Sequence, residues 1–254
     1  MTETTNGNKD DLQIIKLSAS SVKTYNQCNL RYYYNYIAKI PRQEWDHLLL
    51  GNLCHRALEL FHREYLENGL NGNSLNKLMT KSFSLAKKEF IGIAEASIVE
   101  AKSLLGDYLK NVIKNGMPLV KGIETSFDFA LTDDIIIRGF LDRLDILKDG
   151  TFHIVDYKTT KNVKYLEPFQ LLMYGLWLKH EYPEIQKFKA SYVLLRHGSK
   201  TKEYDFNLED LKKVEKDLIN YAMKIRQEDK WAPEPSVLCK WCDFVKICPS
   251  QKGW

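Results

Sequence analysis

The first half of the chain carries apolar residues at three- and four-residue steps, a spacing typical of amphipathic helices. Small polar residues over 18–21 favour a helix start, because serine side chains cap free backbone N–H groups. The pattern predicts helices over the following segments: 22–36, 48–66, and 75–114 as two helices broken near Gly92. A Gly-Met-Pro sequence at 116–118 ends this helical region.

The second half of the chain has a different pattern of residue types. β-branched and aromatic residues predict strands over 119–130, 134–147, 151–158, 187–196 and 202–207. Helical spacing returns over 163–181 and 208–229. This order predicts an α/β (α+β) fold with a central mixed sheet flanked by helices. We expect four regions: a flexible tail over 1–16, a helical lobe over 17–118, a core over 119–231 and a cysteine-containing segment over 232–254.

A short turn ending at Gly150 joins two of the predicted strands. A three-residue loop with Gly150 in the left-handed conformation pairs Leu147 with Thr151. This register separates an apolar face from a more polar face, which carries Arg143 and Asp145, better than a two-residue loop would. We therefore expect the three-residue loop.

The same register places Asp142 opposite Asp156 and Phe140 opposite Lys158. Two carboxylates about 5 Å apart on an otherwise apolar face are unfavourable unless a cation lies between them. Mg²⁺ and Mn²⁺ prefer hard oxygen ligands, lower the pKa of bound water and polarise phosphoryl oxygens. Lys158 could orient or deprotonate the water, or stabilise charge on a phosphate. The alternative is a surface salt bridge of these three charged residues, which would contribute little.

Five cysteines are unevenly placed along the chain. Four of them could form one metal site: Cys28, Cys239, Cys242 and Cys248. Four thiolates bind zinc or a [4Fe–4S] cluster, and the spacing alone does not separate these two. The odd count argues against a disulfide scaffold and for a reducing compartment. Cys54 is interpreted as a buried free thiol.

The composition is that of a globular protein. Of 254 residues, 44% are hydrophobic and 28% charged, which excludes wholesale disorder and collagen-like structure. No apolar run approaches the roughly 18 residues that span a bilayer, and the polar start is unlike a signal peptide. We therefore expect a cytoplasmic protein with no membrane partner. The net charge of +4 permits nucleic-acid binding without arguing for it.

Several short motifs, taken in order, resemble a known family. Residues 139–145 read Gly-Phe-Leu-Asp-Arg-Leu-Asp, residues 156–158 read Asp-Tyr-Lys, and Gln170-x-x-x-Tyr174 follows. Together they resemble the RecB-like branch of the PD-(D/E)XK nucleases. Gly51-x-x-x-His55 is similar to the histidine motif of that branch.

The serines at 18 and 20 and the cysteine pattern resemble the iron–sulfur members of that branch, which include the CRISPR-associated spacer-acquisition exonucleases and the AddB nuclease subunits. The resemblance runs from about Ser18 to Pro249. It implies a restriction-endonuclease-like core over 119–231 and favours a structural [4Fe–4S] cluster over zinc at the four cysteines.

The resemblance also implies roles for the matching residues. His55, Asp142 and Asp156 would bind a catalytic Mg²⁺ or Mn²⁺ ion, with the backbone carbonyl of Tyr157 as a further ligand. Lys158 would be the catalytic lysine.

Gln170 and Tyr174, one helical turn apart, would support the site and contact DNA. Glu124 lies where many relatives carry an acidic residue. His62 has no such support, and we expect it at the surface.

The function implied is that of a divalent-metal-dependent DNA exonuclease, a hydrolase of phosphodiester bonds that acts on single-stranded or frayed ends. The CRISPR-associated relatives imply 5′-to-3′ cleavage. DNA repair or recombination, CRISPR adaptation and phage DNA metabolism all remain open, with a helicase, integrase or recombination protein as partner. One alternative is a DNA-binding or end-holding subunit with little nuclease activity. Another is a zinc-binding RNA-interaction module, which explains the cysteines but not the acidic hairpin.

Overall fold

The computed structural model of the protein describes residues 14–42, 46–164 and 166–251. The helices are α1 (Ala19–Gln27), α2 (Asn29–Tyr32), α3 (Asp46–Asn68), α4 (Leu75–Lys87), α5 (Glu95–Asn115), α6 (Phe169–Glu181) and α7 (Leu208–Gln227), with a π-helical segment at Tyr33–Ile37. The strands are β1 (Ile15–Leu17), β2 (Val120–Thr132), β3 (Ile135–Ile146), β4 (Phe152–Lys158), β5 (Lys187–Leu194) and β6 (Lys200–Asn207). The expected mixed α/β fold is confirmed.

The six strands form one mixed sheet in the order β1-β3-β4-β5-β6, with β2 paired to β3. β2 runs antiparallel along most of β3. β1 pairs in parallel with Ile135–Ile137, and β4 pairs antiparallel with Arg143–Ile146. β1 and β4 therefore share the second edge of β3 at its two ends. Among the described strands, none pairs with that edge over residues 138–142.

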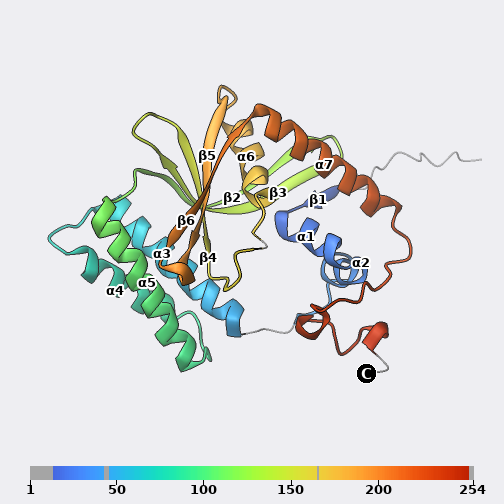
Figure 1. Ribbon diagram of the computed structural model, residues 1–254, viewed down its shortest axis with the longest axis horizontal. Coiled ribbons are helices and arrows are strands. Elements are labelled where there is room, and N and C mark those ends of the chain that lie inside the picture. The colour runs from blue at the N-terminus through green and yellow to red at the C-terminus, as the bar shows by residue number, and fades with distance from the viewer. Residues whose placement is uncertain (1–13, 43–45, 165, 252–254) are drawn as a thin grey trace, which may run out of the picture.

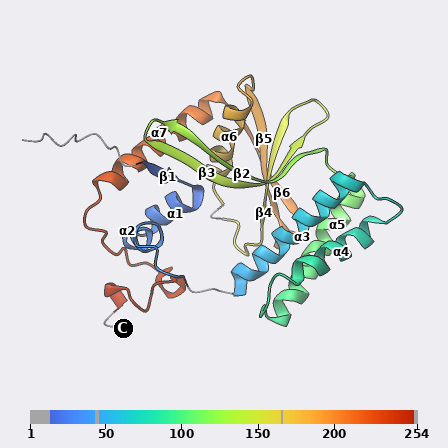
Figure 2. The same ribbon diagram turned by 180° about the vertical axis from the view of Figure 1, so that it is seen from behind.

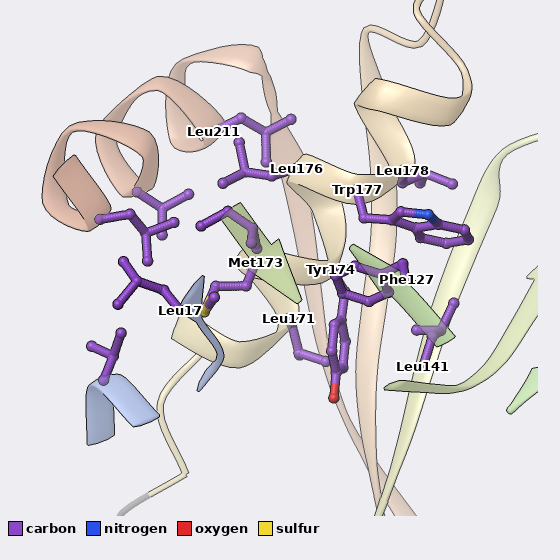
Figure 3. Close-up of a cluster of buried hydrophobic side chains, with 14 of the residues drawn as sticks. Leu17, Phe127, Leu141, Leu171, Met173, Tyr174, Leu176, Trp177, Leu178 and Leu211 are labelled. Carbon is purple, nitrogen blue, oxygen red and sulfur yellow. The ribbon is translucent and has the colours of Figure 1, made fainter. Parts of the chain in front are cut away.

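Helices cover both faces of the sheet (Figures 1 and 2). One hydrophobic cluster joins α1, α6 and α7 to the sheet, and part of it is drawn in Figure 3. A second cluster joins α3, α4 and α5 to the opposite face, through residues such as Val155 and Val193. Buried apolar area on both faces stabilises the sheet as the middle layer. Within the described part of the chain, no helix combines the length and apolarity needed to cross a membrane.

The predicted hairpin is confirmed at its turn. Leu147 and Thr151 form the closing pair, with Leu147 N to Thr151 O at 2.9 Å, and Gly150 has a φ of 83°. The predicted ladder continues only to Arg143 and Val155.

The predicted pairs of Asp142 with Asp156 and of Phe140 with Lys158 are wrong, because the two strands separate beyond Val155. There β4 pairs only with β5. The Asp142 side chain accepts the Tyr157 N–H instead.

Three predicted element boundaries are corrected. The single helix over 22–36 is broken at Cys28, which has an extended backbone and ends α1 while capping α2. The helix expected from residue 163 begins only after Pro168, whose ring cannot continue a helix in the N-terminal direction. Residues 15 and 16, assigned to a flexible tail, lie in β1, whereas residues 1–13 of that tail lie outside the described residues.

An exposed turn over 69–73 joins α3 to α4. Gly69, Asn71 and Gly72 have positive φ values of 59°, 42° and 77°, a conformation that glycine and asparagine adopt at low cost.

Candidate active site

Asp142 lies at an irregular point of β3. Leu141 and Leu144 are buried in the same hydrophobic cluster, although they are three positions apart. Side chains of a regular strand alternate between faces, so the alternation changes phase between these residues. Glu124 lies opposite Asp142 in the β2–β3 register and has a φ of 45°. Such a left-handed conformation costs a non-glycine residue on the order of 1 kcal/mol, and strain of this kind gathers at functional sites.

The Asp142 carboxylate is held by two elements. Its Oδ2 accepts the Tyr157 N–H of β4 at 2.7 Å. Its Oδ1 lies 3.3 Å from Nδ1 of His55 on α3. Asp142 is therefore fixed where β4 separates from β3, and α3 presents a histidine to it.

Asp156 is almost fully buried and bonds to β4 and α6. Its Oδ2 lies 2.5 Å from Lys158 Nζ. Its Oδ1 accepts from Gln170 Nε2 at 2.9 Å and lies 3.5 Å from the Tyr174 hydroxyl. Gln170 also accepts from Lys158 Nζ at 3.0 Å. Figure 3 shows the Tyr174 hydroxyl pointing out of the hydrophobic cluster in which its ring is packed.

A cation fits this donor set. The ligand atoms of His55, Glu124 and Asp142 all lie within 4.8 Å of one another. Asp156 Oδ2 is buried and, despite the nearby Lys158, has no hydrogen bond of acceptable geometry among the described residues. The Lys158 ammonium already meets this oxygen, so the donor set that favours a metal is that of His55, Glu124 and Asp142.

The pKa shifts in the site reflect burial and the short distances between its carboxylates. Burial, and then the charge of Asp142, raise the pKa of Glu124 to about 7. Burial raises the pKa of Asp156 to about 6, although the Lys158 ammonium opposes the shift. Burial lowers the pKa of His55, but the charge and hydrogen bond of Asp142 outweigh it and raise that pKa to about 9. For Asp142, the charge and hydrogen bond of His55 outweigh burial and lower the pKa.

The structure places His55 beside Asp142. It also groups Asp156 with the predicted residues Lys158, Gln170 and Tyr174. The Tyr157 N–H joins the two groups, and the roles of these residues stay predictions. The alternative of a surface salt bridge does not hold, because Asp142 and Asp156 are 8% and 1% exposed. Tyr157 lies between two site residues and donates its N–H to Asp142, so a ligand role for its carbonyl stays a prediction.

The sequence indicated little about the roles or positions of two residues, Glu124 and His62. Glu124 belongs to the group that could hold a metal, together with His55 and Asp142. His62 was expected at the surface and is 1% exposed, bonded to Tyr108. His62 lies seven residues after His55, which is two turns along α3. This spacing places both histidines on the same face of the helix and could have indicated that His62 is buried.

The four cysteines expected to form a metal site line one cavity of about 40 Å³. Cys28 Sγ lies 3.4 Å from the backbone nitrogens of Arg31 and Glu234, and Cys239 Sγ lies 3.2 Å from that of Ser236. N–H groups directed at sulfur are typical partners of metal-bound thiolates. Cys54, by contrast, is fully buried and free, as predicted.

A groove of about 1460 Å³ leads to the candidate site. It runs past β1, α1 and the unpaired edge of β3, and its lining includes Gln170 and Tyr174. Phe140, two residues from Asp142, is 64% exposed in this groove. The cations Lys16, Lys39 and Arg138 also line it and are exposed.

The chain is similar in sequence to subunits of ATP-dependent helicase/deoxyribonucleases. The chain is 24% identical over 201 residues to an ATP-dependent helicase/deoxyribonuclease subunit from Streptococcus pyogenes serotype M1, and 25% identical to the corresponding protein from Streptococcus pyogenes serotype M12 (strain MGAS2096). Each match covers 72% of this chain but only 18% of the relative's length.

The chain also matches a solved structure and the sequence model of a protein family. The crystal structure of a "Putative exonuclease" from Eubacterium rectale shares the fold, with a TM-score of 0.50, 14% identity, and coverage of 95% of this chain and 92% of that chain. The model of the PD-(D/E)XK nuclease superfamily matches residues 16–249. Because this match spans nearly the whole chain, including the carboxylates and the lysine described above, the protein belongs to the PD-(D/E)XK nuclease superfamily.

Proposed function

We propose that the protein is a divalent-metal-dependent DNA exonuclease that hydrolyses phosphodiester bonds from single-stranded or frayed ends. The observation that carries this proposal is the set of buried carboxylates, Asp142 and Asp156, held beside Lys158 and His55. Nucleases of this superfamily use divalent metals, and the donor set here fits one.

The residues that would hold Mg²⁺ or Mn²⁺ are His55, Asp142 and Glu124, whose ligand atoms lie within 4.8 Å of one another. The family resemblance adds Asp156 and the Tyr157 carbonyl. When bound, such an ion lowers the pKa of water and neutralises charge on a phosphate.

The remaining chemistry belongs to Lys158 and its neighbours. The ammonium of Lys158 is held between Asp156 and Gln170, and its side chain is 23% exposed, so a phosphate can reach it. A cation preorganised in this way stabilises the charge that develops on the phosphate during cleavage. Gln170 in turn bonds to Tyr174, which fixes the amide that orients Asp156.

The groove supports single-stranded DNA as the substrate. Exposed cations along its wall match a phosphate backbone, and Phe140 offers an aromatic surface on which an unpaired base can stack. The 5′-to-3′ direction is proposed from the resemblance to the CRISPR-associated exonucleases.

We also propose a [4Fe–4S] cluster at the four cysteines, with a structural role. The cavity between the thiols and the N–H groups directed at sulfur support a bound metal centre there, and the family resemblance favours iron–sulfur over zinc. Iron, sulfide and zinc content of anaerobically purified protein would distinguish the two.

The biological setting is proposed from the relatives. The named relatives are parts of a helicase/deoxyribonuclease, which favours DNA repair or recombination and a helicase partner in the cytoplasm. CRISPR adaptation with an integrase, and phage DNA metabolism, are the other settings.

The test is a time course on end-labelled single-stranded DNA with Mn²⁺, Mg²⁺ or EDTA. We expect degradation that requires the metal and falls by about a hundredfold or more in Asp156→Ala and Lys158→Ala. Lys161→Ala, which replaces an exposed lysine in the loop after β4, is the matched control and should keep full activity. Comparison of the 5′ and 3′ labels gives the direction.

If wild type and variants all bind the DNA but none degrades it, the proposed activity fails. The isolated chain would then be an end-holding subunit.

A further inference from the structure

A buried polar cluster lies behind the candidate active site, on the face of the sheet that α3 and α5 cover. We call it the Arg143 cluster; it consists of Arg143, Asp145, Tyr157, Tyr108 and His62. Each of these residues is at most 6% exposed.

Arg143 and Asp145 form a two-pronged ion pair along β3. Arg143 Nε lies 2.8 Å from Asp145 Oδ1, and Nη2 lies 2.9 Å from Oδ2. This paired geometry fixes the plane of the guanidinium group, so the third nitrogen, Nη1, points in a defined direction.

Three groups meet at Arg143 Nη1. The Tyr157 hydroxyl lies at 2.5 Å, the Tyr108 hydroxyl at 2.7 Å and His62 Nε2 at 3.0 Å. The Tyr108 hydroxyl also bonds to His62 Nε2 at 2.6 Å. Nη1 carries two hydrogens, so these three partners share them, and burial together with the Arg143 charge lowers the pKa of His62, which keeps its ring neutral. One nitrogen thus ties two strands to two helices.

On the strands, the cluster is adjacent in sequence to the site residues. Arg143 follows Asp142 on β3, and Tyr157 separates Asp156 from Lys158 on β4. The bond from Arg143 to Tyr157 therefore spans the point where the β3–β4 ladder ends. Together with the bond from the Tyr157 N–H to Asp142, it links the two strands where their backbone ladder has ended.

On the helices, the cluster fixes the element that carries the site histidine. His62 lies two turns beyond His55 on α3. Its contacts with Arg143 and with Tyr108 of α5 set the distance of α3 from β3.

Stability alone is a weak reason for such a cluster. Replacing a buried ion pair by apolar residues of similar volume is often neutral or stabilising. Five polar side chains in this layer, otherwise packed with apolar residues, therefore indicate a requirement for fixed geometry.

We infer that the Arg143 cluster is a positioning device for the metal site. It holds β3, β4 and α3 in the arrangement that lets Asp142, Asp156 and His55 bind a divalent cation tightly. The side chains of Arg143, Tyr157, Tyr108 and His62 are then positioning groups, which act through the ligands and touch neither metal nor DNA. This inference rests on the proposed metal-binding function.

The test compares Mn²⁺ binding by calorimetry in the full chain, without DNA. The double variant Tyr108→Phe/Tyr157→Phe removes two hydroxyls and keeps both rings. We expect its dissociation constant for Mn²⁺ to rise by about 10- to 100-fold, the range found when outer partners of metal ligands are removed. Tyr204→Phe, which removes a hydroxyl bonded to the Leu166 carbonyl, is the matched control and should bind Mn²⁺ like wild type.

Thermal unfolding separates positioning from a purely structural role. Added Mn²⁺ should raise the melting temperature of wild type and Tyr204→Phe more than that of the double variant. A folded double variant with wild-type Mn²⁺ affinity would overturn the inference, as would a wild type that binds no Mn²⁺.

If the double variant does not fold, Tyr108→Phe alone gives the same comparison with a smaller expected shift. Tight, cluster-dependent Mn²⁺ binding without DNA cleavage would refute the nuclease function and leave this inference standing.

Discussion

At the scale of single residues, Glu124 shows how local backbone strain and charge meet at the candidate site. Its left-handed backbone lies opposite Asp142, and the proximity of that carboxylate adds to the burial that raises its pKa. Both features are unfavourable in the protein without metal. A bound cation would offset the electrostatic part, because it favours the ionised carboxylate.

The first residue-scale prediction concerns Glu124→Gln, which keeps the size of the side chain and removes its charge. We expect the metal-free variant to melt at a higher temperature than wild type at pH 8, because repulsion with Asp142 is gone. The Mn²⁺ dissociation constant should rise by roughly tenfold or more. Glu89→Gln, in an exposed ion pair with Arg56, is a control that should leave Mn²⁺ affinity unchanged.

Unchanged Mn²⁺ affinity in Glu124→Gln would remove Glu124 from the ligand set. That result would not argue against the other proposed ligands.

The proximity of the central residues could be predicted because each lies in a short motif with a fixed spacing. Asp156 and Lys158 are two positions apart on one strand, so a correct strand assignment already places them on one face. Glu124 and His62 were placed less well for a different reason. The position of Glu124 depends on how β2 pairs with β3, and that of His62 depends on how α3 packs against α5. Neither follows from local periodicity.

At the scale of elements, the incomplete pairing of β3 explains both the groove and the exposed Phe140. Regular periodicity predicted most strands and helices, but it could not show that β1 and β4 share one edge of β3 and leave residues 138–142 open between them. Pairing between distant segments is a tertiary property, so a run of three residues such as β1 carries no strong local signal.

The element-scale prediction tests this open edge. Phe140→Ala should weaken single-stranded DNA binding by about 1–3 kcal/mol, the range for loss of one stacking side chain. The measurement is fluorescence anisotropy in EDTA, so that binding is separated from cleavage. Ile91→Ala changes an even more exposed apolar residue, in the α4–α5 loop, and should bind like wild type. Equal affinities for the two variants would exclude Phe140 as a contact.

At the scale of the whole molecule, the two ends of the described chain are joined near the four cysteines. Arg31 and Asp243 form an ion pair at 3.2 Å, and Leu30 N donates to the Ala232 carbonyl. Tyr34 packs against Phe244, and Tyr32 stacks on Trp231. Tyr32 and Tyr34, near the start of the chain, therefore pack against the segment that carries the other cysteines.

The whole-molecule prediction concerns the proposed cluster as a cross-link between residues 28 and 239. By analogy with disulfides, closing a loop of this length stabilises the fold by up to about 5 kcal/mol. Cys242→Ser should therefore lose iron and unfold at lower denaturant concentration. Cys54→Ala, which alters a buried cysteine outside the cavity, should keep its iron content. Unchanged folding stability in Cys242→Ser would rule out a structural role for the cluster.

The turn over 69–73 divides the chain in an unexpected way. A cut there would give one piece with Cys28 and His55 and another with Asp142, Asp156 and Lys158. Neither piece would contain a whole catalytic centre or a whole cysteine set. Expressed as two separate polypeptides, the halves would constitute a split enzyme, in which cleavage of DNA reports that the two have reassembled.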